Sequence, residues 1–265
     1  MSTPRVALTI AGTDSGGAAG IAADLTTFAG MGLHGACAVT AVTAQDTTGV
    51  HRIVQLTAAD VQAQIDAVLG DLPVSVIKTG MLGSPQIAEL VANIRQDLPI
   101  VVDPVLVATS GAELGDVDVV RAYREHLLPR ATVITPNLDE AVRLSGAGND
   151  DSPEDIAQAL HAMGPSVVLT GGDPTTRRCR DVLVDSHGRT TVLEHQAIHT
   201  TNDHGTGCTF SAALAAGLAT GQDLKQATQA AQTFVARALK VSQNWQLGRG
   251  RGPVAHINPQ PTQES

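Results

Sequence analysis

The chain has 265 residues, 43% of them apolar and 26 of them glycine, which allows one large α/β domain with a full core. A formal net charge of −9 and an aromatic content of 2% argue against a nucleic-acid or anionic-membrane partner. Three scattered cysteines exclude a disulfide framework and a zinc site, and no apolar run approaches the roughly 20 residues of a membrane span. The N-terminus lacks the pattern of a signal peptide, so we expect a cytoplasmic protein.

Short apolar runs alternate with amphipathic runs along most of the chain. The expected strands are residues 5–11, 36–43, 74–78, 99–102, 132–135 and 166–170. The expected helices are residues 21–31, 58–69, 85–95, 117–127, 139–145 and 153–163. This alternation predicts parallel strands joined by helical crossovers, and the continuous apolarity of the strands predicts helices on both faces of the sheet.

The pattern changes in the last third of the chain. Residues 181–185 and 190–195 flank a Ser-His-Gly-Arg turn and are expected to form a hairpin at one edge of the sheet. Two helices are expected at residues 209–219 and 224–242. No linker divides the chain, so we predict one domain over residues 1–245 and a tail over residues 246–265 that is loop and then disordered.

Glycine-rich or acidic tracts follow several of the expected strands. They are residues 12–17, 79–81, 103–104, 135–137 and 171–173. Ligands of open α/β sheets bind outside the carboxyl ends of the strands. The sequence therefore predicts a ligand site at that edge of the sheet.

The tract Asn-Asp-His-Gly-Thr-Gly-Cys-Thr, residues 202–209, stands directly before an Ala/Leu-rich helical segment. Backbone N–H groups and the positive end of the helix dipole would converge there, which favours an anion such as phosphate. Cys208 would lie at the mouth of this site with a lowered pKa, as a base or nucleophile. The competing interpretation is an ordinary turn followed by a buried cysteine.

A second glycine-rich loop, residues 12–20, joins the first expected strand to the first expected helix. It can cradle an anion or admit a flat substrate close to the backbone. No Lys-Ser/Thr pair follows it and the G-x-G-x-x-G spacing is absent, so it is neither a Walker loop nor a dinucleotide fingerprint.

Polar side chains at three strand ends are candidates for metal and substrate binding. Asn137 and Glu140 are spaced as a capping box, and the functional alternative is that Glu140 holds Mg²⁺ through water beside substrate phosphates. Asp103 is a second metal candidate, or a turn residue before Pro104. Gln45 can read a donor and an acceptor on a heterocycle, or be a solvated loop residue.

Seven collinear segments resemble the hydroxymethylpyrimidine/phosphomethylpyrimidine kinases of thiamine biosynthesis, in the ribokinase-like superfamily. They are residues 7–28, 38–50, 77–84, 101–111, 135–141, 204–219 and 247–256. The resemblance implies a three-layer αβα sandwich with a central, mostly parallel sheet and no large lid domain. It also implies an ATP-dependent, Mg²⁺-dependent kinase of 4-amino-5-hydroxymethyl-2-methylpyrimidine and of its monophosphate, assembled as a homodimer.

The same resemblance implies residue roles. Gly205, Thr206 and Gly207 would form the anion hole, and Cys208 would replace the aspartate base of the wider superfamily. The substrate pocket would contain Gly12, Asp14, Ala19, Gln45, Met81 and Val107. Asn137, Thr170 and Gly172 would bind the nucleotide, and Glu140 and Asp103 the metal.

The chain departs from the family pattern at several positions. Lysine is usual at three positions where this chain has Thr26, Thr109 and Thr170. Glycine, glutamine and histidine are usual where it has Ala18, Ala22 and Asp173, respectively. Each lost charge-assisted phosphate contact is worth about 1.5–3 kcal/mol. Arg177, Arg178 and Arg180 could supply replacement charge, or form a solvated basic loop. A pyridoxine/pyridoxal kinase and a non-catalytic ligand-binding homologue remain alternative functions.

Overall fold

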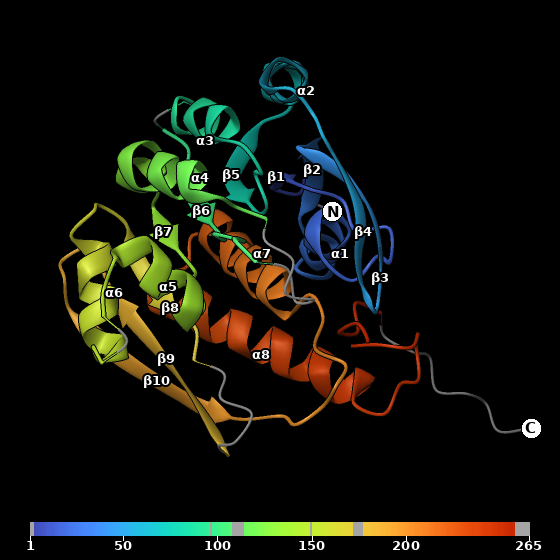
Figure 1. Cartoon of the computed structure of the whole chain (residues 1–265), viewed down its shortest axis with the longest axis vertical. Helices are drawn as coiled ribbons and strands as arrows, with labels where there is room; N and C mark the ends of the chain where they lie inside the picture. The colour runs from blue at the N-terminus through green and yellow to red at the C-terminus, as the bar shows by residue number, and fades with distance from the viewer. Residues whose placement is uncertain (1–2, 96, 108–113, 149, 172–176, 258–265) are drawn as a thin grey trace, which may run out of the picture.

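A computed structural model of the chain describes residues 3–95, 97–107, 114–148, 150–171 and 177–257. Its centre is an eight-stranded sheet in the order β10-β9-β8-β7-β6-β5-β1-β2 (Figure 1). The parallel strands are β1 (Val6–Ala11), β2 (His34–Val39), β5 (Val74–Thr79), β6 (Ile100–Val102), β7 (Val133–Ile134) and β8 (Ser166–Leu169). The antiparallel hairpin of β9 (Arg178–Val184) and β10 (Thr190–Gln196) extends one edge, as expected.

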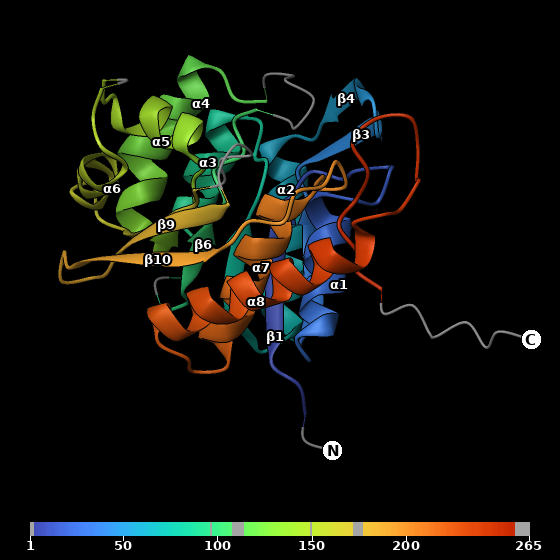
Figure 2. The ribbon, with the colours of Figure 1, turned by 90° about the horizontal axis from the view of Figure 1, so that it is seen from below.

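Helices cover both faces of the sheet, which confirms the three-layer αβα prediction (Figure 2). One layer contains α2 (Ala58–Asp71), α3 (Pro85–Ala92), α4 (Val117–Ala122), α5 (Leu138–Ser145) and α6 (Pro153–His161). The other contains α1 (Gly20–Gly30), α7 (Thr206–Ala219) and α8 (Leu224–Ser242). Among the described residues, none of these helices combines the length and the apolarity that crossing a bilayer requires.

Two hydrophobic cores hold these layers to the sheet. Leu8 and Ile10 of β1 pack toward α2–α6, while Ala7, which precedes Leu8, packs toward α7. Because every residue of β1 is buried, its sequence is apolar except at Thr9 rather than alternating. α7 is almost wholly buried, and its run of alanines lets it lie close under the strands.

The predicted strand over residues 36–43 is wrong. β2 ends at Val39, and β3 (Ala41–Asp46) pairs instead with β4 (Gly49–Gln55) in a separate two-stranded hairpin. The break is fixed at Thr40, whose hydroxyl donates to the backbone oxygen of Met81 at 2.7 Å. β4 gave no sequence signal, because most of its residues are exposed and carry no apolar alternation.

The C-terminal tail lies along the domain as far as residue 257. The backbone N–H groups of Arg249 and Gly250 donate to Thr47 Oγ1 at the tip of the β3–β4 hairpin, at 3.0 and 3.1 Å. Further along, Val254 N donates to the backbone oxygen of His204 at 3.1 Å. The tail therefore joins the hairpin to the turn that precedes α7.

Candidate active site

A cavity of about 250 Å³ opens at the carboxyl ends of the parallel strands. It lies where the strand order reverses between β1 and β5, which is where open α/β sheets bind ligands. Its lining includes Gly12, Asp14, Ala19, Gln45, Met81, Asp103, Val107, Asn137, Glu140, Thr170, Gly205, Thr206, Gly207 and Cys208. The structure thus brings the candidate residues together around one space, except Gly172, which lies outside the described residues.

The turn before α7 leaves backbone donors facing this cavity. Gly205 has φ +88°, and a Cβ there would lie 1.8 Å from the backbone oxygen of Ala18, so only glycine fits. α7 has no side-chain cap and no acidic residue in its first turn. In the described part of the chain, the N–H groups of Gly207 and Cys208 have no hydrogen-bond partner. Such a helix N-terminus accepts an anion.

The loop between β1 and α1 does not serve as a second anion cradle. The Asp14 carboxylate accepts the N–H groups of Gly16, Ala18 and Ala19 at 2.8, 3.1 and 2.9 Å, so these donors are already used. The loop instead admits close approach of a flat ligand. A Cβ on Gly12 would lie 2.5 Å from Met81 Cε, at the wall of the cavity.

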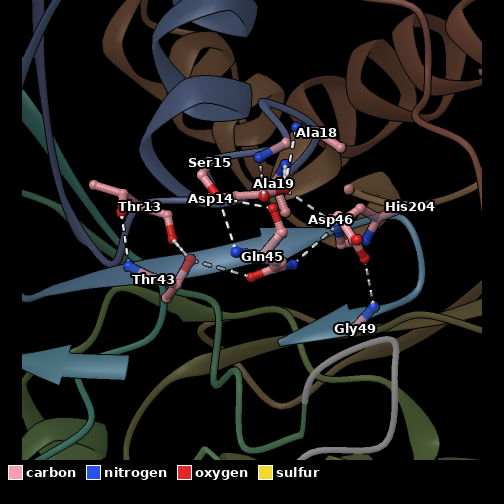
Figure 3. A network of polar contacts seen from close by, with 12 residues as sticks. Thr13, Asp14, Ser15, Ala18, Ala19, Thr43, Gln45, Asp46, Gly49 and His204 are labelled. Atoms are coloured by element: carbon pink, nitrogen blue, oxygen red, sulfur yellow. Dashed lines mark hydrogen bonds and ion pairs between the residues drawn. The ribbon is translucent and has the colours of Figure 1, made fainter. Parts of the chain in front are cut away.

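A polar network joins this loop to β3 and to the turn before α7 (Figure 3). His204 Nε2 lies 3.1 Å from Asp14 Oδ2 and 3.1 Å from the Gln45 side-chain nitrogen. Burial opposes ionisation of Asp14, but the His204 contact and the loop N–H groups outweigh it and lower the pKa of Asp14. The sequence places His204 beside the glycine turn, but nothing in it indicates these partners 159 and 190 residues away.

A buried charged cluster lies beneath the turn that precedes α7. Lys78 Nζ is 2.9 Å from Asp24 Oδ1 and 3.6 Å from Asp103 Oδ2, and all three side chains are almost wholly buried. Thr9 donates to Asp24 at 2.6 Å, and Ser211 donates to Asp103 at 2.9 Å. A lysine in an apolar strand run is the only sequence signal for this cluster.

The predicted lowering of the Cys208 pKa is wrong. Burial raises the pKa of the Cys208 thiol to about 12, although the Lys78 ammonium and the Gly20 N–H oppose this. The helix N-terminus does not outweigh the loss of water around the sulfur. Cys208 is therefore a neutral thiol at pH 7 before substrates bind.

Glu140 and Asp103 form a pair of buried carboxyl groups in the cavity wall. Burial and the nearby Asp103 charge raise the pKa of Glu140 to about 8, against hydrogen bonds from backbone N–H groups. The capping box is also present, because Asn137 Oδ1 accepts Glu140 N at 2.9 Å and Glu140 Oε2 accepts Asn137 N at 3.1 Å. The capping and metal interpretations of Glu140 are thus compatible.

The described residues contain no group of three metal-ligating side chains. Mg²⁺ takes one or two carboxylates and fills its other positions with water and substrate phosphates. The repulsion that raises the Glu140 pKa is relieved by a cation beside the two carboxyl groups. The pair fits a magnesium ion on these grounds.

The arginines of β9 do not replace the missing lysines. Arg178 pairs with Glu194 at 2.9 Å, and Arg180 pairs with Glu154 at 3.1 Å. Their side chains are exposed and do not line the cavity. Thr170 does line it, and its N–H donates to the backbone oxygen of Pro136 at 2.9 Å, which joins the ends of β7 and β8.

We expect Glu140→Gln to raise the Mg²⁺ concentration for half-maximal rate and to abolish its dependence on pH. A metal binds the ionised carboxylate, and the pKa of Glu140 is about 8. In the parent protein, the half-saturating Mg²⁺ concentration should therefore fall about tenfold for each unit by which pH rises, up to pH 8, and then stay constant. Asp139→Asn, on the exposed side of the same helix, should keep this slope. An unchanged metal dependence in Glu140→Gln together with lost substrate binding would refute the metal assignment.

A three-layer sandwich with an uncapped helix N-terminus and two buried carboxyl groups around one cavity is typical of small-molecule phosphotransferases of ribokinase-like architecture. Residues 14–255 match the family model described as phosphomethylpyrimidine kinase. The chain belongs to this family.

Named relatives agree with this assignment. The chain is 45% identical to the hydroxymethylpyrimidine/phosphomethylpyrimidine kinase of Synechococcus elongatus, over 98% of this chain and 99% of that protein. It is 42% identical to the thiamine biosynthesis bifunctional protein ThiED of Geobacter sulfurreducens, over 94% of this chain and 52% of that one. The solved ADP complex of Bacillus subtilis pyridoxal kinase superposes with TM-score 0.86 at 38% identity, covering 96% and 98% of the two chains.

Proposed function

We propose that the protein transfers the γ-phosphoryl group of ATP to the hydroxymethyl group of 4-amino-5-hydroxymethyl-2-methylpyrimidine, and then to the resulting monophosphate, in thiamine biosynthesis. One observation carries the proposal: the unpaired N–H groups at the start of α7 and the Gln45 side chain line the same cavity. A phosphoryl group and a heterocycle can therefore lie side by side. Family membership and the relatives named above support the same substrates.

In this proposal the residues of the chain mainly position the reactants. The N–H groups of Gly207 and Cys208 stabilise the charge on the transferring phosphoryl group. Cys208 lies beside the attacking hydroxyl and, in its thiolate form, accepts the proton of that hydroxyl. Glu140 and Asp103 hold Mg²⁺, which neutralises phosphate charge when bound. The β3–β4 hairpin lines the ring side of the cavity through Gln45 and Val50 and reduces the access of water there.

A pyridoxal kinase is the second candidate, because the solved structure named as one superposes over nearly the whole chain. The two functions share the phosphoryl site and differ only in the ring that the pocket accepts. A non-catalytic homologue is the third, since lysines usual in the family are threonines here at positions 26, 109 and 170. The α7 turn and the carboxyl pair that a kinase requires are nevertheless present.

A coupled ADP-release assay separates these candidates. Purified protein is given ATP, Mg²⁺ and, in separate reactions, the pyrimidine alcohol, its monophosphate and pyridoxal. We expect the highest kcat/KM with the pyrimidine alcohol and measurable turnover of the monophosphate. Faster turnover of pyridoxal would establish the second candidate, and no turnover of any substrate would establish the third.

We expect Gln45→Ala to raise the dissociation constant for the pyrimidine alcohol about tenfold or more, with little change for ATP. The substitution leaves polar groups of the bound ring without partners, at a cost of about 1–3 kcal/mol. Gln45→Glu keeps the shape but removes the donor and adds charge, so it should bind the monophosphate still less tightly. Isothermal titration with each ligand measures both effects. Unchanged pyrimidine affinity in Gln45→Ala would remove Gln45 from the pocket.

We further propose that the enzyme is a cytoplasmic homodimer. The paired side chains of Val42 and Val54 on the β3–β4 hairpin are 48% and 46% exposed, which supports an apolar interface there. Analytical ultracentrifugation should show a dimer that Val42→Lys dissociates. A parent protein that sediments as a monomer would contradict this assembly.

A further inference from the structure

The side-chain amide of Gln45 lies between two hydrogen-bonding neighbours that together determine which way it points. Its nitrogen is placed 3.1 Å from His204 Nε2, and its oxygen is placed 3.4 Å from Thr43 Oγ1 (Figure 3). Amide nitrogen and oxygen are nearly equivalent in shape, so their assignment rests on the hydrogen-bond partners. Whether each neighbour donates or accepts a hydrogen bond therefore decides which amide atom faces it.

His204 offers a donor. Its Nε2 lies 3.1 Å from Asp14 Oδ2, and the two side chains are 8% and 3% exposed. The same carboxyl group already accepts three backbone N–H groups of its loop, which stabilises the ionised form. An ionised carboxylate only accepts, so Nε2 must carry a hydrogen. An amide NH₂ group facing that N–H would set two donors against each other.

Thr43 offers an acceptor. Its hydroxyl has one hydrogen, which it donates to the backbone oxygen of Thr13 at 2.8 Å. That contact is shorter than the 3.4 Å from Thr43 Oγ1 to the Gln45 amide, so the hydroxyl hydrogen points to Thr13 and not to Gln45. The remaining lone pairs of Thr43 Oγ1 favour an N–H donor from Gln45. The two neighbours therefore both favour the amide turned by 180°.

We propose that His204, held by Asp14, is a positioning residue that turns the oxygen of the Gln45 amide toward itself and the NH₂ group toward Thr43, and thereby determines which heterocycle edge the pocket accepts. An amide held this way presents its acceptor on the His204 side and its donor on the Thr43 side. It matches a ring whose exocyclic amine faces the His204 side and whose ring nitrogen faces the Thr43 side. The reversed pattern of a 4-oxopyrimidine is rejected.

This inference rests on the proposed function, because it names the edge of the proposed substrate. The test compares two compounds by isothermal titration: the 4-amino pyrimidine alcohol and its 4-oxo analogue, in which the ring nitrogen donates and the exocyclic oxygen accepts. We expect the parent protein to bind the amino compound about 100-fold more tightly, because the analogue leaves buried polar groups unpaired.

We expect His204→Leu to reduce this amino/oxo ratio at least about tenfold, because a freed amide can rotate to suit either compound. His34→Leu, which replaces an exposed histidine at the start of β2, should keep the parental ratio. In the Gln45→Ala background, His204→Leu should change the ratio no further, since the amide is already absent. A His204→Leu ratio equal to the parental one would overturn the inference, because a packing defect weakens both compounds alike.

A second measurement needs no ligand and no variant of His204. Long-range proton–nitrogen NMR spectra of histidine-labelled protein report whether His204 Nε2 carries a hydrogen. We expect a protonated Nε2 at pH 7, and an unprotonated one would overturn the inference even if the enzyme turns over the pyrimidine. Conversely, a protein that binds neither compound but shows the protonated Nε2 would refute the proposed substrate and leave the amide orientation intact.

Discussion

Replacing Cys208 with alanine should lower kcat at least about 100-fold while leaving the fold intact, which is the usual scale for loss of a general base. The side chain is partly buried in the cavity wall, and its own backbone N–H is one of the two donors that we propose for the phosphoryl group. Alanine keeps that N–H, so phosphate binding should survive while proton transfer fails. Steady-state kinetics at saturating ATP and pyrimidine measure the effect.

The pH dependence separates a base from a packing residue. Burial raises the pKa of Cys208 to about 12, so the thiolate is a minor species at neutral pH and increases as pH rises. The rate of the parent enzyme should therefore keep rising above pH 8, where Glu140 is already ionised. Cys208→Ser, which keeps a hydrogen-bonding group of similar shape, should lose most of this rise. Turnover near the parental level in Cys208→Ala would make Cys208 a packing residue.

Much of the fold could be predicted because its sequence signals are local. Strands β1, β5, β6, β7 and β8 are short apolar runs, and helices such as α8 have amphipathic periods and N-caps. The β3–β4 hairpin could not be predicted, since it pairs exposed residues and packs outside the main sheet. Residues 36–43 have the composition of a strand, and the hydrogen bonds of Thr40 to Ala11, Leu56 and Met81 divide them between β2 and β3.

The sequence predicts those parts of the site whose residues lie in one continuous segment. The glycine turn around Gly205 combines a left-handed backbone with the helix that follows it, and both are visible in sequence. The partners of His204 and Lys78 are not, because Asp14 and Asp24 come from segments far away in the chain. The same distance explains the wrong pKa direction for Cys208, since burial depends on how the whole fold surrounds the thiol.

Replacing Lys78 with methionine should destabilise the fold by about 3–5 kcal/mol at pH 8, because it leaves buried carboxylates without their cation. Lys78 is 0% exposed and lies within 2.9–3.6 Å of Asp24 and Asp103. Burial opposes the charge on Lys78, but the nearby acidic groups outweigh it and raise the pKa of Lys78 above its usual range. A raised pKa means that the stability contributed by the Lys78 charge is present throughout the neutral range and is lost only in strong alkali.

The change of this destabilisation with pH provides the stricter test. Burial already raises the pKa of Asp24 against the Lys78 ammonium, and without the ammonium the pKa of Asp24 in the folded variant should rise further above that of the unfolded chain. The variant should then lose stability as pH rises, so its deficit against the parent should be smaller at pH 5 than at pH 8. Urea unfolding at both pH values measures this, with Lys225→Met on the exposed face of α8 as the matched control.

A double variant, Lys78→Met with Asp24→Leu, should recover part of the loss, because it replaces the main ion pair with apolar groups. Recovery without activity would show that the cluster also acts on the reaction, since the Lys78 charge lowers the pKa of the Cys208 thiol above it. A deficit below about 1 kcal/mol at pH 8 in Lys78→Met would contradict the charge balance, because surface substitutions alone produce changes of about that size.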